Sequence, residues 1–299
     1  MFFIKKMINF LKYRFIYFFI SLFVIGLGLF SILKWGYHYS IDFTGGTNLE
    51  YQLNKEIINK ELNKIIKNNK IEVIEERISD KNLILKTKAI DENQEATFKK
   101  DLEKKLGVKI TVLRSETVGP VLGKETINKT VIASVLAILG ILIYMSFAFK
   151  GFDFAASAIL AMIHDFFVVV CSYSLLSHFF GAEVDLMFVT AILTTMSFSV
   201  HDTIVIFDKI REYKASGEAF SLEEGANRAL TETMVRSINN SMTILFMLLA
   251  LTLFGGQTIR FFIITLLIGT ITGTYSSPFV ATPILVWMEK KRNKVKINS

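Results

Sequence analysis

Long apolar stretches separated by polar segments dominate the pattern of this chain. Six stretches of about 20 residues carry few charged side chains, and this is the length that an α-helix needs to cross a bilayer. A spanning segment must also satisfy its own backbone hydrogen bonds, which favours helices over single strands. The predicted membrane helices are 15–36, 126–149, 154–178, 186–207, 237–254 and 259–288.

These spans divide the chain into a membrane region and one polar domain. We predict a polytopic α-helical membrane protein whose single polar domain lies between the first and second spans. The predicted parts are 1–37 (N-terminus and first span), 38–124 (polar domain), 125–289 (five spans, including a loop at 208–236) and 290–299 (basic tail).

The polar domain alternates between strand-like and helix-like patterns. Apolar residues alternate in the strand-like runs and recur at helical spacing in the others. Gly107 follows the second helical run and predicts its end. The order βαββαβ predicts a ferredoxin-like α+β fold. The predicted strands are 47–53, 71–78, 82–88 and 108–114, and the predicted helices are 55–69 and 91–106.

The positive charge of the chain indicates membrane topology rather than nucleic-acid binding. The formal net charge is +7, but the basic residues flank apolar runs and are not combined with base-stacking aromatic residues. Short cytoplasmic flanks of membrane helices are enriched in Lys and Arg, so both termini are predicted to be cytoplasmic and 38–124 extracytoplasmic. The residues that set this orientation are Lys5, Lys6, Lys12, Arg14, Lys150, Lys209, Arg211, Lys214, Arg228, Arg236, Lys290, Lys291, Arg292, Lys294 and Lys296.

The fourth span carries polar residues where lipid-compatible residues are expected. Thr195, Ser199 and Asp202 are spaced at i, i+4 and i+7, so they share one helix face. Ionisable residues inside a membrane usually face a bundle interior and often relay protons. Asp202 is therefore either a proton carrier or a static ion-pair partner.

Arg236 and Asn239 mark the cytoplasmic start of the fifth span. If the fourth and fifth helices are neighbours, Arg236 and Asp202 would lie at similar depth and form a pair. The alternative is that the long arginine side chain reaches the membrane surface as a topology anchor.

Other polar residues are candidates for a relay through the bundle. His164 and Asp165 lie deep in the third span, and His201 precedes Asp202. Because adjacent helical residues point to different faces, a metal site is not favoured, and the single cysteine, Cys171, excludes an intrachain disulfide. We expect no cofactor and no enzymatic activity, since the chain shows no nucleophile–base pair.

Small residues and helix signals complete the pattern. Gly269 and Gly273 have the G-x-x-x-G spacing of close helix packing, and Pro278 and Pro283 predict a bend in the sixth span. A capping box at 221–224 predicts a short helix along the cytoplasmic surface.

Several motifs, in order along the chain, resemble those of the SecD/SecF family of protein-export membrane proteins, in the resistance–nodulation–division (RND) superfamily. Asp42, Gly45 and Gly46 match its D-F-x-G-G motif. The other matching segments are Val118-Gly-Pro120, His164-Asp165, Asp202-Thr-Ile-Val-Ile-Phe-Asp-Lys-Ile-Arg-Glu212, Phe254-Gly-Gly256 and Gly273-Thr-Tyr-Ser-Ser277.

The resemblance implies a function in protein export across the bacterial inner membrane. Family members are expected to pair SecF with SecD, to associate with the SecYEG channel and to use the proton-motive force on a translocating unfolded polypeptide. By motif position, Asp202 matches the proton-carrying aspartate and Arg236 the essential arginine. His201 replaces a usual asparagine and Pro278 a usual aliphatic residue. The coupling ion, H⁺ or Na⁺, and the stoichiometry with SecD do not follow from the motifs.

Two other functions remain alternatives. A passive scaffold would stabilise the translocation machinery and tolerate loss of the Asp202 charge. A small-molecule or lipid exporter of the same superfamily usually has two six-helix halves and two large outer domains, whereas this chain has one polar domain and shows no internal repeat.

Overall fold

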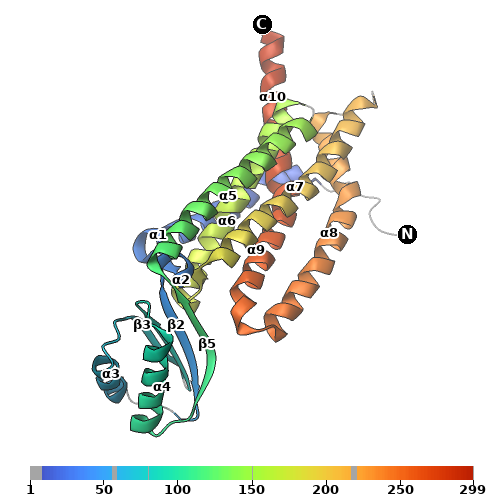
Figure 1. Ribbon diagram of the computed structural model, residues 1–299. Coiled ribbons are helices and arrows are strands. Elements are labelled where there is room, and N and C mark those ends of the chain that lie inside the picture. The colour runs from blue at the N-terminus through green and yellow to red at the C-terminus, as the bar shows by residue number, and fades with distance from the viewer. Residues whose placement is uncertain (1–8, 56–58, 80, 150, 217–220, 299) are drawn as a thin grey trace. The chain divides into compact units, whose positions relative to one another are not determined.

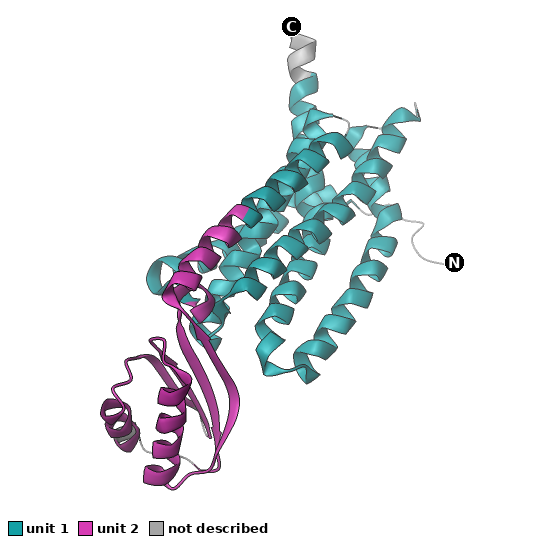
Figure 2. Cartoon of the chain, in the orientation of Figure 1, with its two compact units in different colours: residues 1–38, 133–299 teal, residues 39–132 magenta. Residues whose placement is uncertain are grey.

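A computed structural model describes the chain except residues 1–8, 56–58, 80, 150, 217–220 and 299, and the side chains of 59–60, 79 and 294–298. Lys5, Lys6 and Lys150 therefore lie outside the described residues, as do the side chains of Lys294 and Lys296. The chain divides into two compact units, residues 1–38 with 133–299 and residues 39–132 (Figure 2).

In the described part of the chain, six helices are long and apolar enough to cross a membrane, as the hydrophobic pattern predicts. They belong to a multi-pass helical membrane protein. The last helix is interrupted near Pro278 by a π turn, η3 (Ser277–Ala281), followed by α10 (Thr282–Asn298). The spanning helices are α1 (Arg14–Trp35) after the 3₁₀ turn η1 (Phe10–Tyr13), α5 (Pro120–Ala148), α6 (Phe152–Phe180), α7 (Leu186–Ala215), α8 (Leu222–Phe254) and α9 (Arg260–Ser276) after the turn η2 (Gln257–Ile259).

Helix α7 is the centre of the first unit. It packs against α6, α8 and α9, and α1 packs against α6 (Figure 1). On this face α7 is lined with small and hydroxyl residues, which let neighbouring helices approach closely. The bundle thereby buries side chains of α7 from lipid along most of its length.

The loop expected at 208–236 is largely helical. Helix α7 continues to Ala215, and α8 begins at Leu222. The capping box is confirmed, because Ser221 Oγ accepts a hydrogen bond from the Glu224 amide while the Glu224 carboxylate accepts one from the Ser221 amide. The prediction of a separate surface helix is wrong. Its residues form the first turns of α8, since no helix breaker separates them from the membrane span.

The second unit has the predicted element order. Strand β2 (Gly46–Leu53) is followed by α3 (Asn59–Asn68), β3 (Val73–Ser79), β4 (Asn82–Thr87), α4 (Glu92–Leu106) and β5 (Ile110–Val118). The sheet order is β3-β4-β2-β5 with antiparallel pairs throughout, and the register places Leu49 opposite Leu85. The short elements β1 (His38–Tyr39), α2 (Ile41–Thr44) and β6 (Glu183–Val184) complete the chain.

A single apolar core stabilises this α+β unit. Leu49, Leu85, Phe98 and Leu102 are completely buried, and α3 and α4 pack against each other on one face of the sheet (Figure 1). Gly107 ends α4 in the left-handed conformation (φ 59°), which glycine adopts without steric cost, so the predicted helix end is confirmed.

Candidate functional site

The polar face of α7 lies inside the bundle. Thr195, Ser199 and Asp202 retain only 5%, 2% and 3% of their surface exposed. Their shared face follows from the helical repeat, and its burial places hydroxyl groups and a carboxyl group away from lipid. The predicted stripe therefore lines the contacts of α7 with its neighbours.

Asp165 of α6 joins three helices through its carboxylate. Ser199 of α7 and Ser276 of α9 both donate hydrogen bonds to Asp165 Oδ2, the second at 2.6 Å. His164 Nδ1 lies 2.8 Å from the other oxygen, Oδ1. Asp165 is 4% exposed, so every one of these bonds forms away from lipid. A buried carboxylate with three partners is well suited to hold α6, α7 and α9 together.

His164 completes one side of this cluster. Its side chain is 12% exposed, and its second ring nitrogen, Nε2, is buried without a hydrogen-bond partner among the described residues. A buried polar atom without a partner is costly in a membrane interior. The His164–Asp165 pair therefore has one ring nitrogen without a hydrogen-bond partner among the described residues, next to a carboxylate whose two oxygens both have partners.

Asp202 lies in a different environment from Asp165. Its Oδ2 atom is buried and has no hydrogen-bond partner in the part of the chain that the structure describes. Ser237 of α8 lies beside the carboxylate, and His201 Nδ1 is 4.0 Å from Oδ1. The His201 side chain itself is 68% exposed and points away from the bundle. Asp202 thus sits at the α7–α8 contact with spare hydrogen-bonding capacity.

The pairing of Asp202 with Arg236, one of the two alternatives that the sequence leaves open, is not seen among the described residues. Among the ion pairs of the described residues none joins these two side chains, and Arg236 is exposed whereas Asp202 is buried. Arg236 and Ser237 are consecutive, so their side chains point about 100° apart around α8. Ser237 takes the position facing Asp202, and Arg236 points outward.

The polar residues of α8 that follow Arg236 on the same face point away from the helix bundle. Asn239, Asn240 and Thr243 are exposed like Arg236, while Thr233, Ser237 and Ser241 form the buried face. At 1.5 Å per residue, Thr243 lies about 16 Å along the helix from Phe254, near the middle of a span. Polar side chains at this depth normally face protein or water rather than lipid.

Gly269 and Gly273 bring α9 against the polar face of α7. A Cβ atom added to Gly269 would lie 2.1 Å from Thr195 Cγ2, and one added to Gly273 would lie 3.0 Å from Ser199 Cβ. Position 269 therefore needs glycine for this approach of the two helices, and a side chain at position 273 would have to displace Ser199 slightly. The close contact is what allows Ser276, one turn further on, to reach Asp165.

The π turn continues the polar contact between α7 and the last span. Ser277 shares a 2.8 Å hydrogen bond with Thr203 of α7, and Thr282 donates one to the Ser277 carbonyl. Pro278 lies within the turn and has no amide hydrogen, which favours a departure from regular α-helical bonding. The wide turn adds hydroxyl groups at the depth of Asp202.

The D-F-x-G-G motif forms a tight turn in the second unit. Asp42 lies in the first turn of α2, where its amide donates to Ser40 Oγ. Gly45 (φ 70°) and Gly46 (φ 126°) follow in conformations that favour glycine. A Cβ atom on Gly45 would lie 2.8 Å from Pro120 Cα, and one on Gly46 would lie 2.5 Å from the Thr87 carbonyl oxygen. The two glycines of the motif are therefore required by the backbone geometry.

Three hydroxyl groups of the site were missing from the sequence-based interpretation. Ser276 and Ser277 are named only as part of the Gly273-Thr-Tyr-Ser-Ser277 motif, without a role in the site. Ser237 is not named, although Thr233, Ser237 and Ser241 share an i, i+4 spacing that marks one face of α8. Within the described residues no group of three or more His, Cys, Asp or Glu side chains could hold a metal ion. Cys171 is fully buried, in contact range of Gly28 on α1.

Comparison with known proteins places the chain among protein-export components. The family model "Protein export membrane protein SecD/SecF, C-terminal" matches residues 98–291. The chain is 38% identical to the protein translocase subunit SecF of Thermobaculum terrenum, over 95% of each protein. It is 37% identical to SecF of Anaerolinea thermophila, over 95% of this chain and 94% of the relative.

A solved structure agrees with this relationship. The crystal structure of SecDF, a translocon-associated membrane protein from Thermus thermophilus, matches with a TM-score of 0.85 and 29% identity. The match covers 97% of this chain and 40% of that longer one, so the chain corresponds to part of SecDF. The sequence motifs, the six spanning helices and these relatives together show that the chain belongs to the SecD/SecF family of protein-export membrane proteins.

Proposed function

We propose that the chain is an accessory subunit of the bacterial Sec protein translocase that couples the proton-motive force to polypeptide translocation. The relatives carry the name protein translocase subunit SecF, which supports the Sec role. The single observation that carries the coupling is Asp202, a buried carboxylate with one oxygen that lacks a hydrogen-bond partner among the described residues.

Proton binding at Asp202 would act on the contact between α7 and α8. The charged carboxylate favours the Ser237 hydroxyl as a donor, whereas the protonated group can itself donate. Two packings of α7 on α8 would then differ in their affinity for the proton, which is the requirement for a coupled conformational change. Asp165 would keep α6, α7 and α9 together while α8 moves. The coupling needs no covalent chemistry, so we propose a non-enzymatic subunit without a cofactor.

The outward polar face of α8 supports pairing with SecD. Arg236, Asn239, Asn240 and Thr243 extend from the membrane edge to its middle and need a polar neighbour there. We assign this neighbour to SecD, with an acidic group of SecD opposite Arg236. Cysteines placed at Asn239 should cross-link to SecD in membranes, whereas cysteines at Phe147, an exposed residue of α5, should not.

The same proposal includes the membrane topology, the role of the second unit and the source of the polypeptide. Both termini face the cytoplasm of the inner membrane, and the second unit, which we class as ferredoxin-like from its strand order, handles the emerging polypeptide outside. The SecYEG channel supplies that polypeptide. Labelling of single cysteines from each side of the membrane tests this orientation. Labelling of second-unit residues only from the cytoplasmic side would show that the opposite orientation holds.

Export into membrane vesicles under an imposed pH gradient tests the proposal. Asp202→Asn should abolish the gradient-dependent part of export while assembly persists. Asp208→Asn is the matched control, because Asp208 is a carboxylate on the same helix with a 61% exposed side chain paired to Arg211. Full export by Asp202→Asn would favour a passive scaffold. A response to a sodium gradient alone would replace H⁺ by Na⁺ as the coupling ion.

A further inference from the structure

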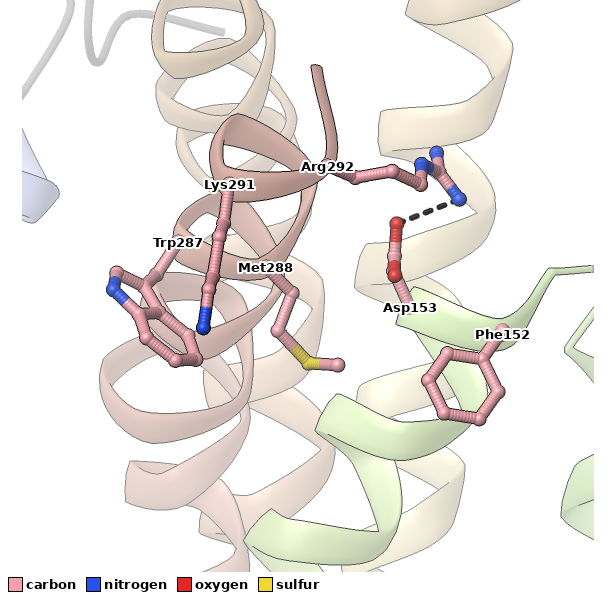
Figure 3. Close-up of a pocket in the computed structure, with 6 residues that line it drawn as sticks. All are labelled: Phe152, Asp153, Trp287, Met288, Lys291 and Arg292. Carbon is pink, nitrogen blue, oxygen red and sulfur yellow. Dashed lines mark ion pairs between the residues drawn. The ribbon is translucent and has the colours of Figure 1, made fainter. Parts of the chain in front are cut away.

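An open hollow of about 360 Å³ lies between the start of α6 and the end of the last span (Figure 3). Both elements belong to the first unit, and both reach the hollow where a membrane-spanning segment ends. Its walls combine aromatic, aliphatic and charged side chains. The lining residues are Phe152, Asp153, Trp287, Met288, Lys291 and Arg292.

Among the described residues, one cation of the hollow has no anionic partner. Arg292 Nη1 lies 2.7 Å from Asp153 Oδ2, and this carboxylate is nearly buried. Lys291 lies beside Trp287 instead, with its ammonium nitrogen 5.5 Å from the ring centroid (Figure 3). No ion pair among the described residues includes Lys291. A ligand in the hollow would therefore meet an available ammonium group.

The neighbouring lysine differs in this respect. Lys290 Nζ lies 2.5 Å from Glu223 Oε1, so its charge is already compensated across the bundle. Glu289, at 2% exposure, is likewise paired with Lys214 at 2.6 Å. Among the described side chains at this end of the last span, Lys291 is thus the cation without a carboxylate partner, and it lines the hollow.

The apolar walls of the hollow are exposed. Phe152 and Trp287 keep 77% and 59% of their surfaces accessible, and Met288 lies between them. Tryptophan is enriched at the boundary between hydrocarbon and headgroups, and exposed phenylalanine at the end of a spanning helix suits contact with acyl chains. The hollow therefore offers an apolar surface beside the ammonium group of Lys291.

We propose that this hollow binds an anionic phospholipid. The headgroup phosphate would accept hydrogen bonds from Lys291 and from the outer face of Arg292, and the acyl chains would cover Phe152, Met288 and Trp287. Basic groups beside a span end are the usual means of recognising anionic headgroups. The combination of one free cation with two exposed aromatic residues at a membrane boundary favours a lipid over an acidic protein segment, which needs no apolar surface for acyl chains.

The position of Trp287 allows a direct test in the full-length protein. The chain has two tryptophans, so a Trp35→Phe background leaves Trp287 as the only tryptophan fluorophore. The protein is reconstituted in phosphatidylcholine vesicles that contain either brominated phosphatidylglycerol or brominated phosphatidylcholine. Bound brominated chains quench Trp287, so brominated phosphatidylglycerol should quench more strongly at equal mole fraction. Equal quenching by the two lipids would overturn the proposal.

Two matched variants separate a site from general surface charge. Lys291→Gln should weaken the preference for phosphatidylglycerol about fivefold, the effect of one basic residue near a membrane surface. Lys290→Gln removes the same charge one position away and should leave the preference unchanged, with helix content checked by circular dichroism for both. An equal loss in both variants would show a diffuse electrostatic effect and reject the site.

Discussion

Two buried carboxylates of the same bundle have opposite environments. Asp165 accepts hydrogen bonds from Ser199 and Ser276 and contacts His164, so both of its oxygens have a partner. Asp202, at similar burial, has one oxygen without a partner among the described residues. A satisfied group stabilises a single arrangement, whereas a group with spare capacity gains a partner when it takes up a proton. The comparison separates a structural carboxylate from a coupling carboxylate.

The largest effect on stability is expected at Asp165. Asp165→Leu would remove the carboxylate acceptor of two buried hydroxyl donors, Ser199 and Ser276, at about 1–3 kcal/mol each, and also the partner of His164, so we expect a loss of at least about 2 kcal/mol. Asp202→Leu removes a group that is already partly unpaired and should cost less than about 1 kcal/mol. Reversible unfolding in detergent, followed by circular dichroism, measures the free energy of unfolding of both variants. Equal losses of stability would contradict the distinction between the two carboxylates.

A smaller effect is expected where α9 contacts α7. Gly269→Ala would place a Cβ atom 2.1 Å from Thr195 Cγ2 and should cost about 1–3 kcal/mol through overpacking. Gly140→Ala on α5 is the control, because a Cβ atom there meets nothing within 4 Å. Gly140→Ala should leave the free energy of unfolding unchanged or raise it by up to about 1 kcal/mol, because alanine has a higher helix propensity than glycine. Similar stability of the two variants would show that the α7–α9 contact is not tight.

The smallest expected effect is the pH dependence of stability that comes from Glu75, a carboxylate outside the membrane. Burial of Glu75 raises its pKa, but hydrogen bonds and charges of Lys86 and Arg77 outweigh burial, and the net pKa of Glu75 is lowered. A folded-state pKa below the unfolded value gives stability that is present above the unfolded pKa and lost as pH falls through the folded pKa.

Acidification should therefore loosen the β3–β4 hairpin in the wild type more than in Glu75→Gln. Hydrogen exchange of this hairpin, corrected for the intrinsic effect of pH, measures the difference. Glu116→Gln controls for loss of a carboxylate at an exposed position of β5. The same acid sensitivity in wild type and Glu75→Gln would remove Glu75 as its cause.

Local patterns were sufficient to predict most elements of this fold. The six spans follow from apolar length, and the βαββαβ order of the polar domain follows from alternating periodicities and from Gly107. The start of α8 was misinterpreted, because apolar periodicity ends near Arg236 while helix-forming residues continue back to Leu222. Residue composition alone does not show that a helix extends beyond the membrane.

The candidate site was only partly predictable for a different reason. The shared face of Thr195, Ser199 and Asp202 is a property of one helix and follows from its repeat. The partners of Asp165 come from positions 34 and 111 residues away, which no local spacing brings together. Likewise, α8 has hydroxyl or amide groups on two faces, and only packing determines that Ser237 rather than Arg236 faces Asp202.

Infrared spectroscopy of the reconstituted protein tests the proposed coupling role of Asp202 most directly. Difference spectra between acidic and alkaline pH contain carbonyl bands of every carboxylate that titrates in this range, so the test is the difference between wild type and variant. Asp202→Asn should remove one carboxylic-acid component from the wild-type spectrum, and Asp165→Asn should retain that component. Identical carboxylic-acid bands in wild type and Asp202→Asn would contradict proton exchange at Asp202.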